Sequence, residues 1–310
     1  MVVAPVGIIG LKMNFQWGRR TYVMGIINIT PDSFSGDGLI PTREQDKSGE
    51  NIQVSAVKQA GTFLEAGADI LDIGGESTRP GALPVTADEE AGRVVPVIRA
   101  IISQYPAATI SVDTYRASVA EAALQAGANM VNDVWGFKAD EALADVVAKY
   151  GVPVILMHNR SSWAHAEIQA SLGGRYIGMP YNDLLEDVNR ELLESVSIAH
   201  KAGIDDVNIL LDPGIGFGKT VEQNLELVDR LGEIKALGYP VLLGVSRKSF
   251  IGYTLNLPPE QRLGGTAAAV AIGIARGADI VRVHDVAFMT LVARMTDAII
   301  HWKEVQPMTN

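Results

Sequence analysis

Helical and apolar segments alternate along most of the chain. Four times a helical pattern ends in a similar short sequence that precedes an apolar run. These sequences are Ala66-Gly67-Ala68-Asp69, Ala126-Gly127-Ala128-Asn129, Ala202-Gly203-Ile204-Asp205 and Gly277-Ala278-Asp279. The glycine supplies the left-handed conformation that ends a helix. The runs that follow, such as 70–73 and 280–283, have the length and composition of buried parallel strands. The pattern therefore predicts repeated strand and helix units.

Eight strands are expected from these runs and from similar ones elsewhere. They are Tyr22 to Asn28, Ile70 to Ile73, Thr109 to Asp113, the run after Asn129, Pro153 to His158, Val207 to Asp212, Val241 to Gly244 and Ile280 to Val283. The predicted helices include Ile52 to Ala66, Arg116 to Ala126, Asn182 to Ala202, Val221 to Leu237, Thr266 to Arg276 and Val286 to Ile300. Pro96 lies inside the helical pattern from Asp88 to Gln104, so we expect a kink or a break there.

The predicted fold is a single α/β domain over residues 1–310, a (β/α)₈ TIM barrel. Eight units share 310 residues, about 39 each, which is ample for such a barrel. An open doubly wound sheet is the alternative architecture. Residues 1–21 are expected to form an extension with a short hairpin that closes the barrel floor. The polar stretches Thr30 to Glu50 and Asn159 to Tyr181 are expected to be mobile loops over an active site, with plain surface insertions as the alternative for both.

The amino-acid composition excludes several classes of function. The chain is 47% hydrophobic and 20% charged, enough apolar material for a sizeable core. It has 26 Lys and Arg against 36 Asp and Glu, and 26 − 36 gives −10, which argues against general affinity for nucleic acid or an anionic membrane. The absence of cysteine excludes disulfides and thiolate chemistry. Its apolar stretches are too short to span a membrane, so we expect a cytoplasmic protein.

Nearly every predicted strand ends in a polar residue, and in a TIM barrel those ends surround the active site. Along the chain they are Asn28; Asp72 with Glu76; Asp113; Asn132 and Asp133; His158 and Asn159; Asp212; Ser246, Arg247 and Lys248; and Arg282 with His284. For Asp133, and for Asp285 after the last strand, a cap on the following helix is the better interpretation.

Three loops after strands carry candidate chemistry. The hydroxyl-rich segments Asn28 to Phe34 and Ser77 to Gly81 are consistent with anion binding or with plain turns. Arg79 in the second segment favours the functional interpretation. In Asp212 to Lys219, three glycines would let a flat ligand lie close. Asp212 would then accept N–H groups and Phe217 would offer a packing surface.

Cations follow the last two strands. Arg247, Lys248 and Ser249 open a predicted helical turn and would form an anion pocket. Lys248 could instead form a Schiff base, which defines a different enzyme class. Arg282 and His284 alternate and so point to the same side. The five scattered histidines lack zinc-ligand spacing, which leaves a divalent ion held by oxygens and a substrate phosphate as the metal alternative.

Six motifs, in this order, resemble the dihydropteroate synthase family, and the resemblance runs from about Tyr22 to Ile300. They are Met24 to Ser35 (MGIINITPDSFS), Asp72 to Gly81 (DIGGESTRPG), Ser111 to Thr114 (SVDT), Asp212 to Lys219 (DPGIGFGK), Ser246 to Ser249 (SRKS) and Arg282 to Asp285 (RVHD). The resemblance implies a TIM-barrel transferase and a homodimer formed through barrel helices. Its reaction joins dihydropterin methyl diphosphate to 4-aminobenzoate by an SN1-like path, and yields pyrophosphate and dihydropteroate for folate.

The same resemblance implies site residues. The pterin ligands would be Asp113, Asn132, Asp212 and Lys248. The diphosphate ligands would be Asn28, Arg282 and His284, with Asn28 also a ligand of Mg²⁺. The pocket for 4-aminobenzoate, and for sulfonamide mimics of it, would be formed by Thr78, Arg79, Phe217 and Ser249. The catalytic group would comprise Asp113, Lys248, Asn28, Arg282 and His284, in which the Asp113 charge stabilises a pterin cation.

Two segments depart from the family pattern. Asn159-Arg160 replaces the commoner Met-Gln, so we expect one wall of the pterin pocket to be more polar. In Ser35 to Gly38 (SGDG), the acidic residue and the two glycines stand in a different order from that usual in the family. We expect this change to affect the motion of the loop. Three competing hypotheses remain: a methyltransferase barrel that uses methyltetrahydrofolate with a corrinoid partner, a pterin-binding barrel without activity, and a Schiff-base aldolase that uses Lys248.

Overall fold

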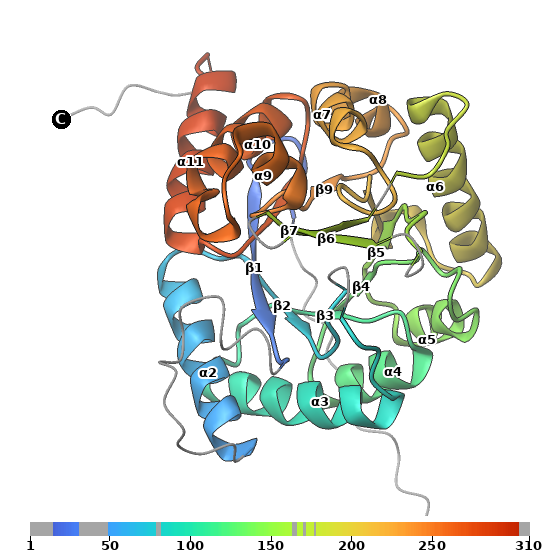
Figure 1. The fold of residues 1–310 in the computed structure, drawn as a ribbon. Coiled ribbons are helices and arrows are strands. Elements are labelled where there is room, and N and C mark those ends of the chain that lie inside the picture. The colour runs from blue at the N-terminus through green and yellow to red at the C-terminus, as the bar shows by residue number, and fades with distance from the viewer. Residues whose placement is uncertain are drawn as a thin grey trace, which may run out of the picture.

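The computed structural model describes residues 15–30, 49–78, 82–162, 166–169, 172–176 and 178–303. In this part of the chain parallel strands stand at the centre and helices surround them (Figure 1). None of the described helices combines the length and the low charge needed to cross a lipid bilayer.

Eight parallel strands form the central sheet, in the order β8-β5-β4-β3-β2-β1-β10-β9. Their bounds are β1 Tyr22–Asn28, β2 Ile70–Gly74, β3 Ile110–Asp113, β4 Met130–Asp133, β5 Val154–Met157, β8 Ile209–Asp212, β9 Leu242–Leu243 and β10 Ile280–Val283. A parallel bridge between Leu211 and Val241 joins the end strands β8 and β9. The sheet is therefore a closed barrel, which confirms the (β/α)₈ prediction and rules out the open doubly wound sheet.

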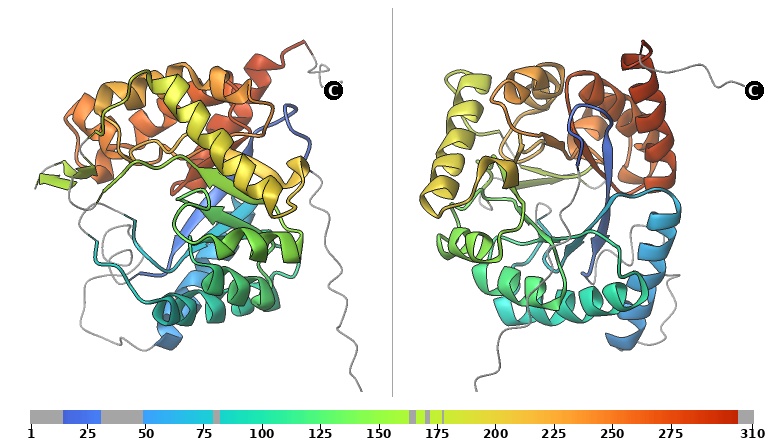
Figure 2. Two further views of the ribbon diagram at one scale, coloured as in Figure 1. Left: turned by 90° about the vertical axis from the view of Figure 1, so that its right-hand side faces the viewer. Right: turned by 180° about the vertical axis from the view of Figure 1, so that it is seen from behind.

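Helices cover the outside of the barrel (Figure 2). They are α2 Gly49–Glu65, α3 Ala87–Gln104, α4 Ala117–Ala126, α5 Ala142–Tyr150, α6 Leu184–Lys201, α7 Val221–Asp229, α8 Leu231–Lys235, α9 Ser249–Leu255, α10 Leu263–Ala275 and α11 Val286–Ile300. Short 3₁₀ turns lie at Asp206–Asn208 and Pro259–Gln261. The apolar faces of the helices pack on the outward side chains of the strands, and this packing forms the larger core.

Several predicted boundaries differ from the observed ones. Helix α3 remains one helix through Pro96, so the expected break is absent. The helix expected over residues 221–237 is two helices, α7 and α8, which meet at Arg230. Strand β8 begins at Ile209, after the 3₁₀ turn, and is shorter than expected.

Aromatic side chains close the barrel floor. Residues 17–20 form a turn, so no hairpin lies in the described part of the N-terminal extension; residues 1–14 lie outside it. Phe15 stacks on Trp17 with ring centroids 4.6 Å apart, and both rings meet Tyr22 edge-on. This trio packs on the inward-facing side chains of the lower barrel. The predicted floor is thus present, but a turn and three aromatic rings form it.

The segment between β5 and α6 contains a small antiparallel hairpin that the sequence did not reveal. Strands β6 (Ala166–Gln169) and β7 (Gly173–Tyr176) pair with Ala166 opposite Tyr176 and Gln169 opposite Gly173. Figure 1 shows this hairpin in front of the barrel mouth. The segment was expected to be a loop over the active site, and it lies there with regular structure of its own.

Candidate active site

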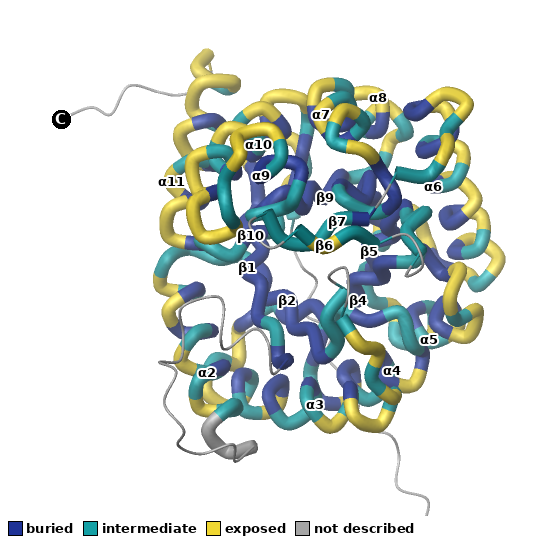
Figure 3. The backbone as a smooth tube through the Cα atoms, viewed as in Figure 1, coloured by how far each residue is buried: buried dark blue, intermediate teal, exposed yellow. Residues whose placement is uncertain are grey.

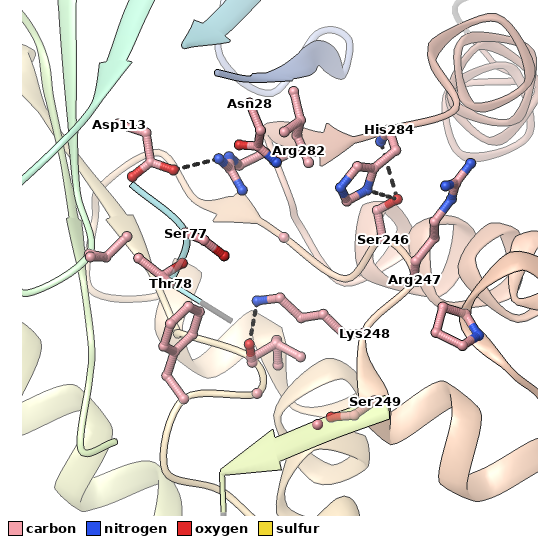
Figure 4. A pocket seen from close by; sticks show the side chains of 18 of the residues that line it. Asn28, Ser77, Thr78, Asp113, Ser246, Arg247, Lys248, Ser249, Arg282 and His284 are labelled. Atoms are coloured by element: carbon pink, nitrogen blue, oxygen red, sulfur yellow. Dashed lines mark hydrogen bonds and ion pairs between the residues drawn. The ribbon is translucent and has the colours of Figure 1, made fainter. Parts of the chain in front are cut away.

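A cavity of about 520 Å³ opens at the carboxyl ends of the barrel strands. This is the size of pocket that encloses a drug-sized ligand. Every predicted site residue in the described part of the chain lines it: Asn28, Thr78, Asp113, Asn132, Asp212, Phe217, Lys248, Ser249, Arg282 and His284. Figure 4 shows many of these side chains around one space. Arg79 and residues 31–48, which include the Ser35 to Gly38 departure, lie outside the described residues.

One guanidinium group serves two carboxylates at the base of the cavity. Arg282 on β10 contacts Asp72 Oδ2 through Nε at 2.5 Å and Asp113 Oδ2 through Nη2 at 2.6 Å. Asn132 donates its amide N–H to the same Asp72 oxygen at 3.1 Å. Asp72 is completely buried, so this cluster ties strands β2, β3, β4 and β10 together below the ligand space.

The cluster carries one more negative than positive charge. Burial raises the pKa of Asp113 to about 7; the Arg282 charge opposes the shift and the Asp72 charge adds to it. Asp72 Oδ1 and the Ser111 hydroxyl, on neighbouring strands, have no hydrogen-bond partner among the described residues. Asp72 was noted in the sequence as a strand-end carboxylate but was given no role. The structure shows that it orients Arg282 and Asn132.

A second charged pair lies on the other side of the cavity. Burial lowers the pKa of Lys248 to about 8, while the charge of Asp212 opposes that shift. Lys248 Nζ donates to the carbonyl oxygen of Ile215 and lies 4.8 Å from the centroid of the Phe217 ring (Figure 4). Asp212 Oδ1 accepts from the Gly214 N–H at 2.7 Å. Asp212 was predicted to accept N–H groups of a ligand; in this structure its Oδ1 accepts a backbone N–H of its own loop, and the ligand contact stays a prediction.

The glycines of loop 213–219 serve packing inside the protein. Gly214 has φ +68°, and a Cβ there would lie 1.8 Å from the carbonyl oxygen of His158. Gly218 has φ +70°, and a Cβ there would lie 2.5 Å from the carbonyl carbon of Arg160. Only Gly216 faces the cavity, beside the aliphatic part of Lys248. The expectation that all three glycines admit a flat ligand was therefore wrong for two of them.

A buried lysine holds the same loop from behind. Lys219 Nζ contacts the carbonyl oxygens of Gly214 and Phe217 at 2.9 and 3.0 Å and His158 Nδ1 at 3.0 Å. Burial lowers the pKa of Lys219 to about 7, and burial and the Lys219 charge lower the pKa of His158 to about 4. The proton therefore resides on Lys219, whose three N–H donors match the three acceptors.

His158 connects Lys219 to helix α6. Its Nε2 lies 3.0 Å from Glu191 Oε2, so we assign the Nε2–H tautomer, with Nδ1 as the acceptor. Glu191 also binds the Arg160 guanidinium. Hydrogen bonds from His158 and then Arg160 hold the pKa of Glu191 below its ordinary range. The sequence did not identify Lys219 and Glu191 as residues that hold loop 213–219 in place. In the sequence, Lys219 is simply a polar residue after a glycine-rich loop, and Glu191 is one of several polar residues on a predicted helix.

The expectation of a more polar pterin wall at Asn159 and Arg160 was wrong. Neither residue lines the cavity, to which this segment contributes Met157. Arg160 turns to Glu191 and lies over the Tyr181 ring at 4.1 Å. Asn159 donates to the Val134 carbonyl oxygen at 2.9 Å. The two residues that depart from the family pattern therefore make contacts behind loop 213–219 and not in the cavity.

The cations after β9 do not meet at one point. Arg247 has φ +56° and turns its guanidinium to Asp285, at 2.6 and 3.0 Å, while Lys248 points the opposite way (Figure 4). The predicted convergence of the two cations was wrong. Asp285 is used in this pair and makes no side-chain cap on α11, against expectation. Asp133 accepts from the Trp135 and Phe137 N–H groups and so stabilises a turn ahead of α5.

Polar contacts also fix the rim. His284 Nδ1 lies 3.0 Å from the Ser246 hydroxyl oxygen. Glu76 lines the cavity and binds Arg116 Nη1 at 2.6 Å, and the same guanidinium binds the buried Glu90. Within the described residues, no group of three or more His, Asp or Glu side chains could hold a metal ion by itself. Asn28 offers the cavity an amide oxygen, a ligand type that suits Mg²⁺.

Comparison with known proteins adds independent information. The profile of the family described as "Pterin binding enzyme" matches residues 24–284. The dihydropteroate synthase of Clostridium beijerinckii is 50% identical over 293 residues, which cover 94% of this chain and 98% of that protein. The dihydropteroate synthase of Bacillus subtilis is 48% identical, with coverage of 92% and 91%.

Solved structures agree with the sequence comparison. A crystal structure of dihydropteroate synthase from Clostridium difficile in the presence of pteroic acid is similar with a TM-score of 0.80 and 47% identity, covering 92% of this chain and 98% of that one. A Xanthomonas albilineans dihydropteroate synthase structure with 4-aminobenzoic acid has a TM-score of 0.78 and 40% identity, covering 93% and 94%.

Proposed function

The chain belongs to the pterin-binding enzyme family, and we propose that it acts in that family as a dihydropteroate synthase. This transferase condenses (7,8-dihydropterin-6-yl)methyl diphosphate with 4-aminobenzoate and releases pyrophosphate. The observation that carries the proposal is the single cavity that joins the Arg282 cluster to the Asp212 and Lys248 pair. No observation favours the methyltransferase, the inactive barrel or the aldolase over this function.

The pterin matches the deep part of the cavity. Its ring nitrogens present several N–H donors, and Asp113 and Asp212 are the acceptors there, with Asn132 beside them. The ring carbonyl accepts from Lys248, whose ammonium group already serves as a donor to Ile215. The pterin then lies over the barrel mouth, with its methyl diphosphate directed to the side of Asn28, Arg282 and His284.

The diphosphate requires positive charge and oxygen-binding groups. Arg282, whose guanidinium is shared with Asp72 and Asp113, lines this cavity together with Asn28 and His284. Mg²⁺ would supply the positive charge that the cluster lacks. The described residues offer no protein-only metal cage. Asn28 would therefore hold a Mg²⁺ ion only together with oxygens of the substrate. When bound, Mg²⁺ neutralises charge on the diphosphate.

The reaction follows an SN1-like path. The bond between the pterin methylene carbon and the diphosphate oxygen breaks, and its electron pair leaves with pyrophosphate. The remaining cation is delocalised over the pterin, and the Asp113 carboxylate stabilises it electrostatically. The amine nitrogen of 4-aminobenzoate then forms the new C–N bond and loses a proton. Thr78, Phe217 and Ser249 line the part of the cavity that would hold 4-aminobenzoate and sulfonamides. The resemblance assigns Arg79, which lies outside the described residues, to the same pocket.

We further propose a cytoplasmic homodimer. Helix α11 presents exposed apolar side chains at helical spacing, namely Phe288, Leu291, Met295 and Ile299, and Ile272 on α10 is also exposed. Figure 3 shows α10 and α11 side by side with exposed outer faces. Apolar residues on neighbouring helices suit a self-complementary interface. The net charge of −10 supports small-molecule substrates and argues against nucleic-acid partners.

The test is product formation by the purified chain. Incubation with both substrates and Mg²⁺ should yield dihydropteroate and pyrophosphate in equal amounts, measured by mass spectrometry and a pyrophosphate assay. Exhaustive chelation should abolish turnover, and added Mg²⁺ should restore it. Absence of dihydropteroate from a folded protein that has both substrates and Mg²⁺ would refute the proposed function. Full turnover after chelation would refute the magnesium requirement.

A further inference from the structure

The β6–β7 hairpin forms part of the cavity wall. Gly173, Gly174 and Tyr176 of β7 line the same space as Ser249 and Phe217. The two glycines contribute backbone only, so Tyr176 is the one residue of β7 that places a large side chain there. The sequence indicated a loop over the active site here but no hairpin, because β6 and β7 are short and carry little hydrophobic alternation.

Tyr176 links two loops assigned to the 4-aminobenzoate pocket. Its hydroxyl donates to the carbonyl oxygen of Thr78 at 3.0 Å. Its ring stacks on that of Phe217, with centroids 6.1 Å apart and an angle of 28° between the planes. Tyr176 is buried. One side chain therefore fixes both the Thr78 backbone and the Phe217 ring.

A buried arginine anchors the hairpin itself. Arg262 donates from Nη2 to the Leu172 carbonyl oxygen at 2.6 Å, from Nη1 to that of Arg247 at 2.9 Å, and from Nε to that of Leu257 at 3.1 Å. A Cβ at Gly252 would lie 2.1 Å from Arg262 Nη2, so glycine makes room for the guanidinium. The arginine thus joins the hairpin to the segments on both sides of α9.

A second contact fixes β7 on α9, the helix that begins at Ser249. The Arg175 guanidinium lies 4.1 Å from the centroid of the Tyr253 ring. Figure 4 shows β7 passing beside Ser249. Together with Arg262, this contact makes the hairpin a rigid wall at the Ser249 end of the cavity.

We propose that Tyr176 is a specificity-determining residue for the arylamine substrate, an inference that rests on the proposed function. The amine of 4-aminobenzoate must face the pterin methylene at the barrel mouth. Its carboxylate end therefore points outward, to Ser249 and the hairpin. Tyr176 orders Phe217 and Thr78 around the ring, and the wall that it forms with Gly173 and Gly174 limits what can be attached beyond the carboxylate.

The experiment compares two arylamines, 4-aminobenzoate and the longer 4-aminobenzoylglycine, at saturating dihydropterin diphosphate and Mg²⁺. In Tyr176→Ala, we expect KM for 4-aminobenzoate to rise about tenfold with kcat changed less than threefold. The preference for 4-aminobenzoate in kcat/KM should fall about tenfold. The dissociation constant of the pterin substrate, measured by calorimetry, should stay within about twofold of wild type.

Two further variants make the test specific. Tyr176→Phe keeps the ring and removes only the donor to Thr78, so it should keep the substrate preference and raise KM about threefold. Ile168→Ala alters an exposed side chain of β6 (67% exposed) and should match wild type. An unchanged preference in folded Tyr176→Ala, or an unchanged KM in Tyr176→Phe, overturns the proposal. Wild-type protein that makes no dihydropteroate from 4-aminobenzoate would refute the proposed function instead.

Discussion

Asp113 belongs to a cluster with one excess negative charge, because it shares the Arg282 guanidinium with Asp72. One guanidinium, Arg282, neutralises one of the two carboxylates that it contacts, and Asp72, buried deeper, keeps its hydrogen bonds to Arg282 and Asn132. In the proposed function, the negative charge that remains lies under the pterin ring, which becomes cationic. In a site of low dielectric such a fixed charge acts more strongly than it would in water. The placement of Asp113 therefore suits stabilisation of a cation.

Asp113→Asn tests this role directly. We expect kcat to fall about 10²-fold or more, because a preorganised charge is removed from the developing cation. The fold should persist, since the amide has the same shape and the carboxylate is already disfavoured by burial. Circular dichroism and thermal melting check the fold, and Asp145→Asn on the exposed face of α5 is the control. Turnover near wild type in folded Asp113→Asn would remove Asp113 from the mechanism.

The same residues predict the pH dependence. Asp113 acts as the carboxylate, so lowering the pH through its pKa of about 7 should reduce kcat/KM. Lys248 acts as the ammonium, so raising the pH through its pKa of about 8 should reduce kcat/KM as well. The profile should be a narrow bell between these values. Asp113→Asn should flatten the acid limb, and Lys248→Arg the alkaline limb. An acid limb that persists in Asp113→Asn would assign it to another group.

Loop 213–219 is the element on which both proposed substrate sites depend, because it carries Phe217 and begins beside Asp212. Two of its glycines pack against the backbone of residues 158–160, and Lys219 binds two of its carbonyl oxygens. Behind it, His158 and Glu191 connect the loop to α6. The loop is therefore held by the protein interior before any ligand binds, which lowers the ordering cost of binding.

The substitution Lys219→Met should loosen loop 213–219. It leaves His158 Nδ1 and two carbonyl oxygens without their donor, so we expect a loss of about 1–3 kcal/mol in the free energy of unfolding. It should also raise KM for 4-aminobenzoate more than it lowers kcat, because Phe217 loses its fixed position. Denaturant unfolding and steady-state kinetics measure both effects, with Lys149→Met on an exposed ion pair as the control. An unchanged KM together with the stability loss would assign Lys219 a purely structural role.

Sequence patterns predicted the elements whose signal is local. The apolar runs before Asn28, Asp113 and Arg282 predicted strands, and their polar ends predicted a shared cavity. Partners distant in sequence were not predictable. The turn of Arg160 toward Glu191 and that of Asp285 toward Arg247 depend on which elements meet in space.

The β6–β7 hairpin escaped prediction for a related reason. Its strands of four residues carry no strong alternation, and its fixed position depends on Arg262, a residue about ninety positions later. The break at Arg230 between α7 and α8 has a similar origin, because apolar positions continue across it. Periodicity shows which residues face a core, but it does not show where tertiary contacts end an element.

At the scale of the whole molecule, the apolar face of α10 and α11 predicts the oligomeric state. The chain has a mass of 33.1 kDa, so a homodimer has 2 × 33.1 = 66.2 kDa. We expect sedimentation at the dimer mass for wild type and at the monomer mass for Leu291→Arg, because a charge in an apolar interface is strongly unfavourable. Leu193→Arg on α6 is the matched control and should remain dimeric. A monomeric wild type would exclude the dimer.

The shared cavity predicts the order in which the two substrates bind. The proposed pterin ligands Asp113, Asn132 and Asp212 lie at the strand ends, whereas Thr78 and Ser249 lie beyond them at the same mouth of the barrel. A bound pterin therefore forms the lower face of the space left for 4-aminobenzoate. Without the pterin, that space is open toward the barrel mouth, and 4-aminobenzoate has contacts on fewer sides.

We therefore expect 4-aminobenzoate, or a sulfonamide mimic, to bind weakly to the free protein and at least tenfold more tightly once pterin, pyrophosphate and Mg²⁺ are present. Arg79→Ala should weaken the second binding step and leave pterin binding nearly unchanged, because the resemblance assigns Arg79 to the 4-aminobenzoate pocket and not to the pterin ligands. Calorimetric titration of 4-aminobenzoate with and without the first ligands measures the difference. Titration of pterin into a protein already saturated with 4-aminobenzoate is the reciprocal control, since coupling between two ligands must be equal in both directions. Equal affinities in the two 4-aminobenzoate titrations would contradict ordered binding.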